Sequence, residues 1–407
     1  MESMKASVIF PAPAAQVEPS APAEGHEVSP SRDKTASVSP DAAQLDALAA
    51  QIRVWARELG FGGIGITDTD LSHAEPGLQQ WLDDGCHGDM DYMAAHGMKR
   101  ARPAELVPGT VRVISVRMNY LPSDIDVGAW RKHEAARMHM PGEAVVSIYA
   151  RGRDYHKVVR GRLQQLADRI AQAIGPFGYR VFTDSAPVLE VELAQKAGLG
   201  WRGKHTLLLS RDAGSLFFLG EIFVDVPLPV NDGAARGEHC GQCQRCRDVC
   251  PTGAITEAFR VDARLCVSYL TIEHKGAIPE PLRAKMGNRV YGCDDCQLFC
   301  PWNKFAQPSP LPDFAPRNGL DRSSLVTLFA WTEAEFMTRL EGSPIRRIGH
   351  ERWLRNLAVG LGNALRETHD DTQRAILRDA LLARIDHPSA LVREHVQWAL
   401  AQEGVTA

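Results

Sequence analysis

Eight of the nine cysteines lie at spacings that suit the ligation of iron–sulfur clusters. The first run, C-x2-C-x2-C-x3-C-P over 240–251, is a spacing in which three thiolates hold one 4Fe–4S cluster and the fourth reaches a second cluster. The second run, C-x2-C-x3-C-P over 293–301, lacks its first cysteine because Val290 stands there, and Cys266 is the obvious replacement. We therefore expect two four-cysteine sites, formed by Cys240, Cys243, Cys246 and Cys300, and by Cys250, Cys266, Cys293 and Cys296. Such a chain handles electrons.

The cysteines have two alternative interpretations. Structural zinc also uses C-x2-C pairs, but two zinc sites do not need three cysteines in one seven-residue run followed by Cys-Pro. A disulfide framework is typical of small secreted domains, whereas this chain has 407 residues. The ninth cysteine, Cys86, lies in a polar stretch and is expected to be an ordinary free thiol.

Length and composition indicate an ordinary globular protein of roughly two to four domains. The net charge of −4 gives no global sign of nucleic-acid binding, so such a partner would have to meet a local patch. Apolar runs are too short to span a membrane. The first ten residues form a poor secretory signal, and no twin-arginine pair is present. We expect a cytoplasmic protein that acts as a monomer.

The elements that must position these cysteines follow a tail. Residues 1–43 are rich in Pro, Ala, Ser and Glu, so we expect them to be disordered. Apolar residues from Leu45 to Leu59 recur at helical spacing. Further helices are expected over 158–170 and 187–197, the second with Pro187 in its first turn, and strands over 61–67, 111–116, 179–183, 206–209 and 216–224. Helices interleaved with strands indicate an α/β domain over about 44–235.

Two further domains are expected. Residues 236–305 should form a ferredoxin-like domain of short loops and turns, because metal bonds there replace a core. After several prolines, residues 306–407 become helical. Amphipathic patterns beginning near Leu357, Ile376 and Leu391, separated by turns at 370–371 and 386–388, resemble HEAT-type repeats.

The cysteines and elements alone do not identify a substrate. The glycines of Gly60-x-Gly62-Gly63-x-Gly65 lack the spacing and the following helix of a dinucleotide-binding fingerprint, and there is no phosphate-binding loop. Pattern alone therefore indicates a ferredoxin-like electron carrier joined to a reductase module of unknown substrate.

Three further stretches resemble epoxyqueuosine reductases, the cobalamin-dependent iron–sulfur enzymes of queuosine synthesis in tRNA. They are YARGRDYH at 149–156, DSAPVLE at 184–190 and AGLGWRGKHT at 197–206. The cysteine array, FFLGE at 217–221 and the helical C-terminus also match, so the resemblance covers about 45–400. It implies a nitroreductase-like α/β domain that binds cobalamin, a two-cluster ferredoxin-like domain, and a HEAT-like helical domain that helps to seat tRNA.

The resemblance also implies a reaction, in which the cyclopentane epoxide of epoxyqueuosine in tRNA is reduced to the alkene of queuosine with loss of water. The clusters would pass electrons singly from an external donor to cobalamin, which carries the difficult step. Asp184 resembles the family's proton donor, with capping of the following helix as the alternative role. A helix N-terminus would lower the pKa of Asp184. We expect burial against the corrin to raise this pKa and to be the larger of the two effects in the complex.

Other contacts follow from local chemistry and from the same resemblance. Asp154 and His156 are the expected substrate contacts, with helix capping as the alternative and His156 as the second candidate acid. Seven side chains are expected to contact cobalamin, and their alternative interpretation is that they form turns or surface charges. They are Arg100, Arg151, Lys204, His205, Thr206, Asp294 and Asp295. A tRNA patch is expected within 343–355, where arginines beside an aromatic residue suit phosphate contact and base stacking. The alternative is a solvated helix face. The arginines of this patch are Arg346, Arg347, Arg352 and Arg355.

Other function classes fit the sequence less well. A reductive dehalogenase shares the cobalamin domain and two clusters, but such enzymes usually carry an export signal and tend to use a tyrosine as the acid. A ferredoxin-like electron-transfer subunit would not need a long α/β domain. A non-catalytic tRNA scaffold would leave eight cluster ligands idle.

Overall fold

The structure is a computed structural model that describes residues 41–231 and 239–404. Most of the tail expected to be disordered, residues 1–40, lies outside the described residues. The helix α1 (Ala42–Glu58) begins two residues before the expected domain boundary at residue 44. Asp41 fixes this start, because its side chain accepts from the backbone N–H of Gln44 while the Gln44 side chain accepts from that of Asp41.

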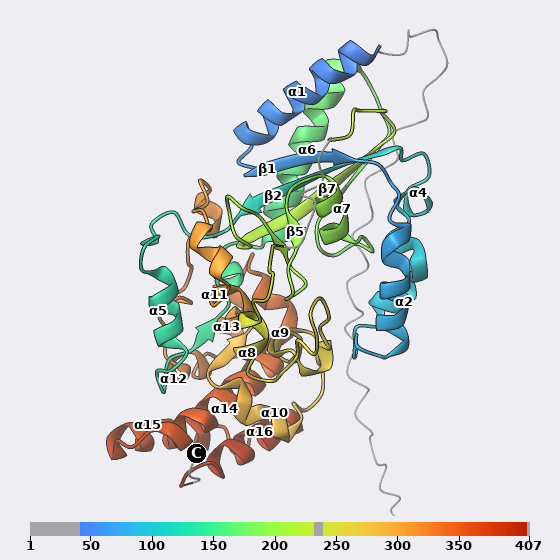
Figure 1. Cartoon of the computed structure of the whole chain (residues 1–407). Helices are drawn as coiled ribbons and strands as arrows, with labels where there is room; N and C mark the ends of the chain where they lie inside the picture. Colours follow the sequence, from blue (N-terminus) through green and yellow to red (C-terminus); the bar gives the residue numbers. More distant parts are fainter. Residues whose placement is uncertain (1–40, 232–238, 405–407) are drawn as a thin grey trace, which may run out of the picture.

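A four-stranded antiparallel sheet forms the centre of the first domain (Figure 1). Its order is β1-β2-β7-β4, formed by β1 (Gly63–Thr67), β2 (Arg112–Asn119), β7 (Phe217–Val224) and β4 (Tyr179–Phe182). These strands confirm four of the five predicted ones within a few residues. The interleaving of helices and strands therefore does not produce a parallel sheet here.

Helices cover both faces of this sheet. On one face, α1 and α6 (Tyr155–Ile174) bury Ile114, Val116 and Ile222. On the other face lies α7 (Glu190–Lys196), against Val113 and Phe223. The end of α7 lies so near to β1 that a Cβ atom on Gly65 would be 2.1 Å from the carbonyl oxygen of Ala197. Glycine at this position therefore permits the close approach of helix and strand.

Two predicted elements are shorter than expected. The helix expected from 187 begins only at Glu190, so Pro187 lies in the preceding turn and not in the first helical turn. Its onset is delayed because Asp184 has φ +54° and the chain turns through residues 185–188 before it becomes helical. The strand expected over 206–209 is reduced to β6 (Leu208–Leu209), which pairs with β5 (Trp201–Arg202). Thr206 has φ +73°, a left-handed conformation that no strand accommodates.

The cysteine-rich part consists of short elements joined to the first domain. It contains α8 (Arg245–Asp248), α9 (Val267–Ile272), α10 (Glu280–Met286), β8 (Arg289–Tyr291) and α11 (Asp295–Leu298). The strand β8 pairs in parallel with β3 (Val145–Val146) of the first domain. Val290, which replaces the missing cysteine, is fully buried in β8. The side chain at this position therefore contributes to the hydrophobic core.

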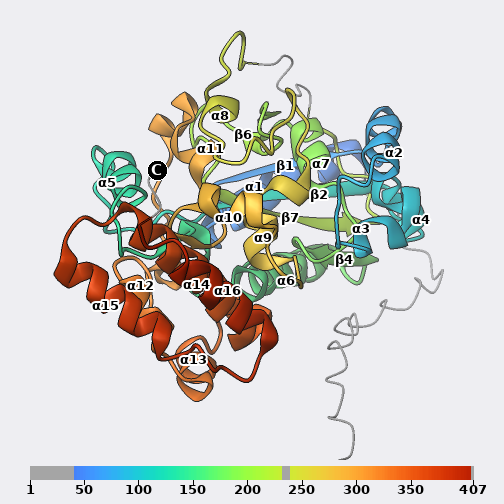
Figure 2. The same ribbon diagram turned by 90° about the horizontal axis from the view of Figure 1, so that it is seen from below.

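The C-terminal part is helical, as predicted. It comprises α12 (Leu325–Phe329), α13 (Glu333–Arg339), α14 (Gly349–Glu367), α15 (Asp371–Leu382) and α16 (Ala390–Leu400). The helices α14 and α16 lie side by side (Figure 2), and α14 also packs against β8. The helical part therefore shares its core with the cysteine-rich part. Within the described ranges, no helix is long and apolar enough to cross a membrane.

Candidate active site

A cleft of about 1230 Å³ lies where the α/β domain meets the cysteine-rich part. One wall comes from the turn after β4 and from α7, and the other comes from residues 257–261, Glu273 and Arg347. Five predicted site residues line this cleft, namely Arg100, His156, Asp184, Thr206 and Arg347. The structure therefore gathers side chains from all three expected domains around one cavity.

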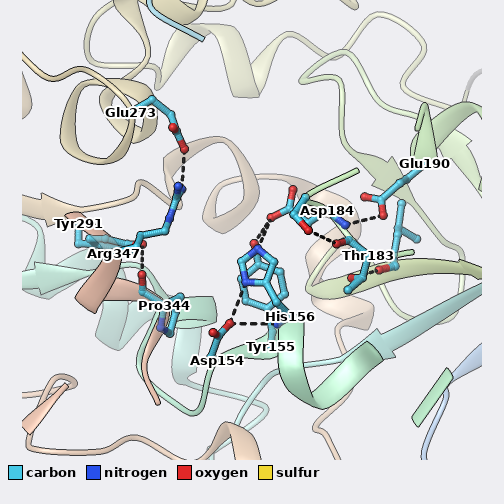
Figure 3. A network of polar contacts seen from close by, with 12 residues as sticks. Asp154, Tyr155, His156, Thr183, Asp184, Glu190, Glu273, Tyr291, Pro344 and Arg347 are labelled. Atoms are coloured by element: carbon cyan, nitrogen blue, oxygen red, sulfur yellow. Dashed lines mark hydrogen bonds and ion pairs between the residues drawn. The ribbon is translucent and has the colours of Figure 1, made fainter. Parts of the chain in front are cut away.

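Asp184 presents its carboxylate to the cleft. Its side chain is 55% exposed, and Oδ2 accepts from the Tyr155 hydroxyl and lies 3.1 Å from Nε2 of His156 (Figure 3). The alternative role as a helix cap is wrong, because Leu189 occupies the N-cap position of α7, with no side-chain capping bond. Burial within the cleft walls raises the pKa of Asp184, but the bonds and charge of His156 and the Tyr155 hydroxyl outweigh it, so the pKa lies below its ordinary value. The expectation that burial against the corrin would raise the pKa of Asp184 concerns the complex and stays a prediction.

His156 lies between two carboxylates. Its Nδ1 lies 2.8 Å from Oδ1 of Asp154, on the side opposite Asp184. Burial lowers the pKa of His156, but the two carboxylates more than compensate and raise it to about 9. Near neutral pH the ring is therefore an imidazolium that holds a proton next to Asp184.

Asp154 has the capping role that was its alternative interpretation. Its side chain accepts from the backbone N–H of His156 and forms the N-cap of α6. It does not line the cleft and stands behind His156. Of the two predicted substrate contacts, only His156 therefore faces the cleft, and Asp154 orients the His156 ring.

Two features of the site were not predicted from the sequence. Tyr155 was quoted in the resemblance, yet its hydrogen bond to Asp184 was missed. The Arg347 guanidinium, expected on a tRNA patch, instead lines the cleft and pairs with Glu273 across the gap from Asp184 (Figure 3). Tyr155 adjoins His156 in the sequence, but its bond to Asp184, 29 residues away, depends on the fold. Glu273 carries no sequence signal.

Among the residues that the structure describes, no group of three or more His, Cys, Asp or Glu side chains is arranged to hold a metal ion. The two cysteine sets therefore stay a prediction, which the pKa shifts of the thiols support. Burial and the neighbouring thiolates of Cys300, Cys240 and Cys243 raise the pKa of Cys246 to about 11. In the second set, burial raises the pKa of Cys296, and the charges of Cys266, Asp295 and Cys250, followed by that of Cys246 from the first set, act in the same direction. The charge of Cys266 also contributes to the raised pKa of Cys293. Crowded thiols of this kind favour a bound cation that stabilises their thiolates.

Three residues expected to meet cobalamin are instead structural, and these predictions were wrong. Arg151 is buried and forms a bidentate ion pair with Glu134. Asp294 is buried and accepts from the Ser147 hydroxyl and the Ile148 backbone N–H, while Asp295 forms a bidentate pair with Arg289. These three residues do not line the cleft.

The segment 204–206 connects the cleft to the first cysteine run. Lys204 Nζ donates to the carbonyl oxygens of Gly241 and Cys243, so it holds the cysteine loop and does not face the cleft. Burial lowers the pKa of His205 to about 4, and its Nδ1 accepts from the Leu207 N–H. His205 is therefore a neutral structural residue. Thr206 alone of the three reaches the cleft wall.

The predicted tRNA patch divides into outer and inner arginines. Arg346 and Arg347 are exposed. Arg355 is fully buried and donates to the carbonyl oxygens of Leu270, His274 and Gly276, so its assignment to tRNA was wrong. Arg352 is half-buried and donates to the carbonyls of Ile348 and Ile272. The side chains of Arg352 and Arg355 therefore hold α14 against the cysteine-rich part.

The cleft fits the corrin that the sequence resemblance implies. Its walls include large apolar side chains, among them Leu78, Val188 and Trp201. Trp201 and Arg202 both line it, and the indole N–H of Trp201 and Nε of Arg202 are buried without a hydrogen-bond partner among the described residues. Orphaned donors beside an apolar wall suit a large flat ligand that carries amide oxygens on its rim. Arg100 contributes less, because its guanidinium is bound to the carbonyls of Met93 and Tyr92.

Comparison with known proteins agrees with this arrangement. Two family profiles match, one described as "4Fe-4S double cluster binding domain" over 239–303 and one as "Epoxyqueuosine reductase QueG, DUF1730" over 100–185. An epoxyqueuosine reductase of Burkholderia pseudomallei is 66% identical over 393 residues, covering 91% of this chain and 96% of the relative. That of Escherichia coli K12 is 55% identical over 359 residues, covering 88% and 90%.

Solved structures share the fold. The structure of epoxyqueuosine reductase from Streptococcus thermophilus has a TM-score of 0.74 at 24% identity and covers 87% of this chain and 90% of that one. A crystal structure of epoxyqueuosine reductase with a tRNA-Tyr epoxyqueuosine-modified stem loop has a TM-score of 0.72 at 22% identity, covering 88% and 99%. At these identities the likeness concerns the fold.

Proposed function

Because this chain belongs to the epoxyqueuosine reductase family, we propose that it reduces the epoxide of epoxyqueuosine in tRNA to the alkene of queuosine. The reaction takes two electrons and two protons, breaks both carbon–oxygen bonds of the epoxide and releases the oxygen as water. The observation that carries the proposal is the proton-holding pair of His156 and Asp184 in a cleft walled on one side by the cluster-binding part.

The two residues of this pair have different tasks. Asp184 is the more exposed, 55% against 27% for His156, so its carboxyl is the group that reaches the departing oxygen. The His156 imidazolium supplies the proton through the 3.1 Å contact with Oδ2 of Asp184. Tyr155 and Asp154 fix the orientations of Asp184 and His156, respectively.

Electrons reach the cleft from the cysteine-rich part. We assign one 4Fe–4S cluster to Cys240, Cys243, Cys246 and Cys300, and the other to Cys250, Cys266, Cys293 and Cys296, following the proximity of each set. Cobalamin, when bound in the cleft, would supply the low-valent metal centre for epoxide reduction. Thr206, Trp201 and Arg202 would hold its rim, because they line the cleft.

The tRNA would approach over the cleft mouth. Arg347 lines the cleft and Arg346 is its exposed neighbour, so both can meet phosphate near the modified nucleotide. The C-terminal helices, as a HEAT-like unit, would extend this surface. The protein would act as a monomer in the cytoplasm and receive electrons from an external donor.

The test is anaerobic purification, assay of iron, sulfide and cobalt, and incubation with epoxyqueuosine-containing tRNA and a strong reductant. Nucleosides from the digested tRNA are then separated by liquid chromatography and identified by mass. Queuosine should appear only when reductant and cobalamin are both supplied. If no queuosine forms with both cofactor types fully loaded, the proposal is wrong.

A further inference from the structure

Two glutamates next to Asp184, the half-buried Glu190 in the cleft wall and the fully buried Glu221, have no place in the mechanism described so far. Glu221 lies in β7, one of the two inner strands of the sheet, and its side chain is fully buried. Neither of its carboxyl oxygens has a hydrogen-bond donor among the described residues. Its carboxyl faces that of Glu190, the first residue of α7. A buried carboxylate without a donor is costly, so this arrangement requires an explanation.

Glu190 connects this pair to the proposed proton donor. Its Oε1 accepts from the backbone N–H of Asp184 at 2.7 Å (Figure 3). Asp184 has φ +54°, a left-handed conformation that residues other than glycine adopt only when surrounding contacts enforce it. The bond to Glu190 is such a contact, because it fixes the peptide from which the Asp184 side chain projects.

The pair can satisfy its own hydrogen bonds if it holds one proton. Two neighbouring carboxyl groups, one of them fully buried in the sheet, do not both ionise, because burial and mutual repulsion oppose the second charge. Burial, with the nearby charge of Asp184, raises the pKa of Glu190 to about 7, and that of Glu221 lies well above its ordinary value. The protonated Glu221 then donates to Glu190, and Glu190 accepts from both Glu221 and the Asp184 N–H.

We propose that Glu190 and Glu221 form a proton-sharing carboxyl pair that positions Asp184, holding the turn after β4 so that the Asp184 carboxylate faces the cleft. This inference rests on the proton-donor role proposed for Asp184. Both glutamates are positioning residues: Glu190 contacts the backbone of Asp184, and Glu221 acts through Glu190. Their function is to keep the acid within reach of the substrate oxygen, where a small displacement is costly for the rate.

The test compares variants that separate positioning from stability. Glu190→Ala should lower kcat about tenfold to a hundredfold with little change in KM for tRNA. Glu221→Gln keeps a donor toward Glu190 and should retain kcat within about threefold. Glu221→Leu removes the donor and should lose kcat as Glu190→Ala does, while its Tm stays equal or rises, because an unpaired buried carboxyl is replaced by an apolar group. The control is Glu58→Gln, an exposed acid on α1 paired with Arg169.

A second measurement does not require turnover. Hydrogen exchange of the Asp184 amide, followed by NMR, should accelerate about tenfold or more in Glu190→Ala and stay near the wild-type rate in Glu58→Gln. Equal exchange rates in wild type and Glu190→Ala, or equal kcat values for Glu221→Gln and Glu221→Leu, would overturn the inference. Failure of the wild type to form queuosine would overturn the proposed function instead, and the exchange experiment would still report on the contact between Glu190 and Asp184.

Discussion

Nε2 of His156 lies 3.1 Å from Oδ2 of Asp184, while its Nδ1 lies 2.8 Å from Oδ1 of Asp154. The ring is thus held at both nitrogens by carboxylates, and of these three residues His156 and Asp184 line the cleft whereas Asp154 does not. One proton shared between His156 and Asp184 is therefore held at the cleft, on the side from which the substrate would approach. This geometry reconciles a lowered pKa of Asp184 with a role in proton donation.

Asp184→Asn should abolish most turnover while iron and cobalamin contents stay at wild-type levels. An amide keeps the shape of the side chain but cannot pass a proton from His156, so kcat should fall on the order of 10²–10⁴-fold. Metal analysis and single-turnover formation of queuosine measure the two effects separately. An unchanged rate would leave Asp184 without a role in proton transfer.

The rate should fall as the pH rises through about 9. The pKa of His156 is raised from 6.5 to about 9, so the imidazolium that supplies the proton is present below that pH and lost above it. The same shift stabilises the fold, with the full effect present below about pH 6.5 and lost as the pH rises through 9. The kcat–pH profile of wild type should show this descending limb, and that of His156→Gln should lack it. A limb that persists in His156→Gln would assign the titration to another group.

Cys266→Ala should remove one cluster and spare the other. Cys266 supplies the ligand that the second cysteine run lacks, so iron should drop from about eight to about four atoms per chain. The matched control is Cys86→Ala, which removes a buried thiol near Arg260 outside both sets. Iron and labile sulfide assays measure the difference. Equal iron in Cys266→Ala and Cys86→Ala would refute the assignment of this ligand.

Spacing and periodicity predicted the features that depend on local sequence. The α6 helix was predicted because Val159, Leu163 and Ile170 all face the core. The cysteine sets were predicted because cluster chemistry fixes the intervals within each run. In both cases the residues that matter are near one another in the chain.

Charged residues were harder to place because their partners are distant in sequence. Arg151 looked like a cofactor contact, but Glu134 neutralises it inside the core. The helix α14 was expected to be amphipathic, yet all residues from Trp353 to Leu365 are buried, since this helix packs on several neighbours. An arginine on such a helix points into the protein, which no periodicity of the segment could show.

Arg355→Met should destabilise the protein without a specific effect on tRNA affinity. The guanidinium satisfies the carbonyls of Leu270, His274 and Gly276, and its removal leaves them buried and unpaired. The cost should be on the order of 3 kcal/mol or more in the free energy of unfolding. Chemical denaturation measures it, with Arg346→Met as the exposed control, expected to shift stability by less than about 0.5 kcal/mol. Similar stability of the two variants would contradict the buried role of Arg355.

Arg347→Ala should weaken tRNA binding and reduce its dependence on salt. Arg347 lines the cleft and pairs with Glu273, so its guanidinium is exposed on one side to the incoming nucleotide and anchored on the other. If it contacts one phosphate, its loss should reduce the slope of log Kd against log salt by about 0.7–0.9. The control is Arg339→Ala on α13, which removes the same charge from an exposed pair with Glu335. Binding of a tRNA stem loop by both variants over a range of potassium chloride concentrations separates a phosphate contact from a general charge effect. Identical slopes for Arg347→Ala and wild type would mean that Arg347 serves only to order Glu273.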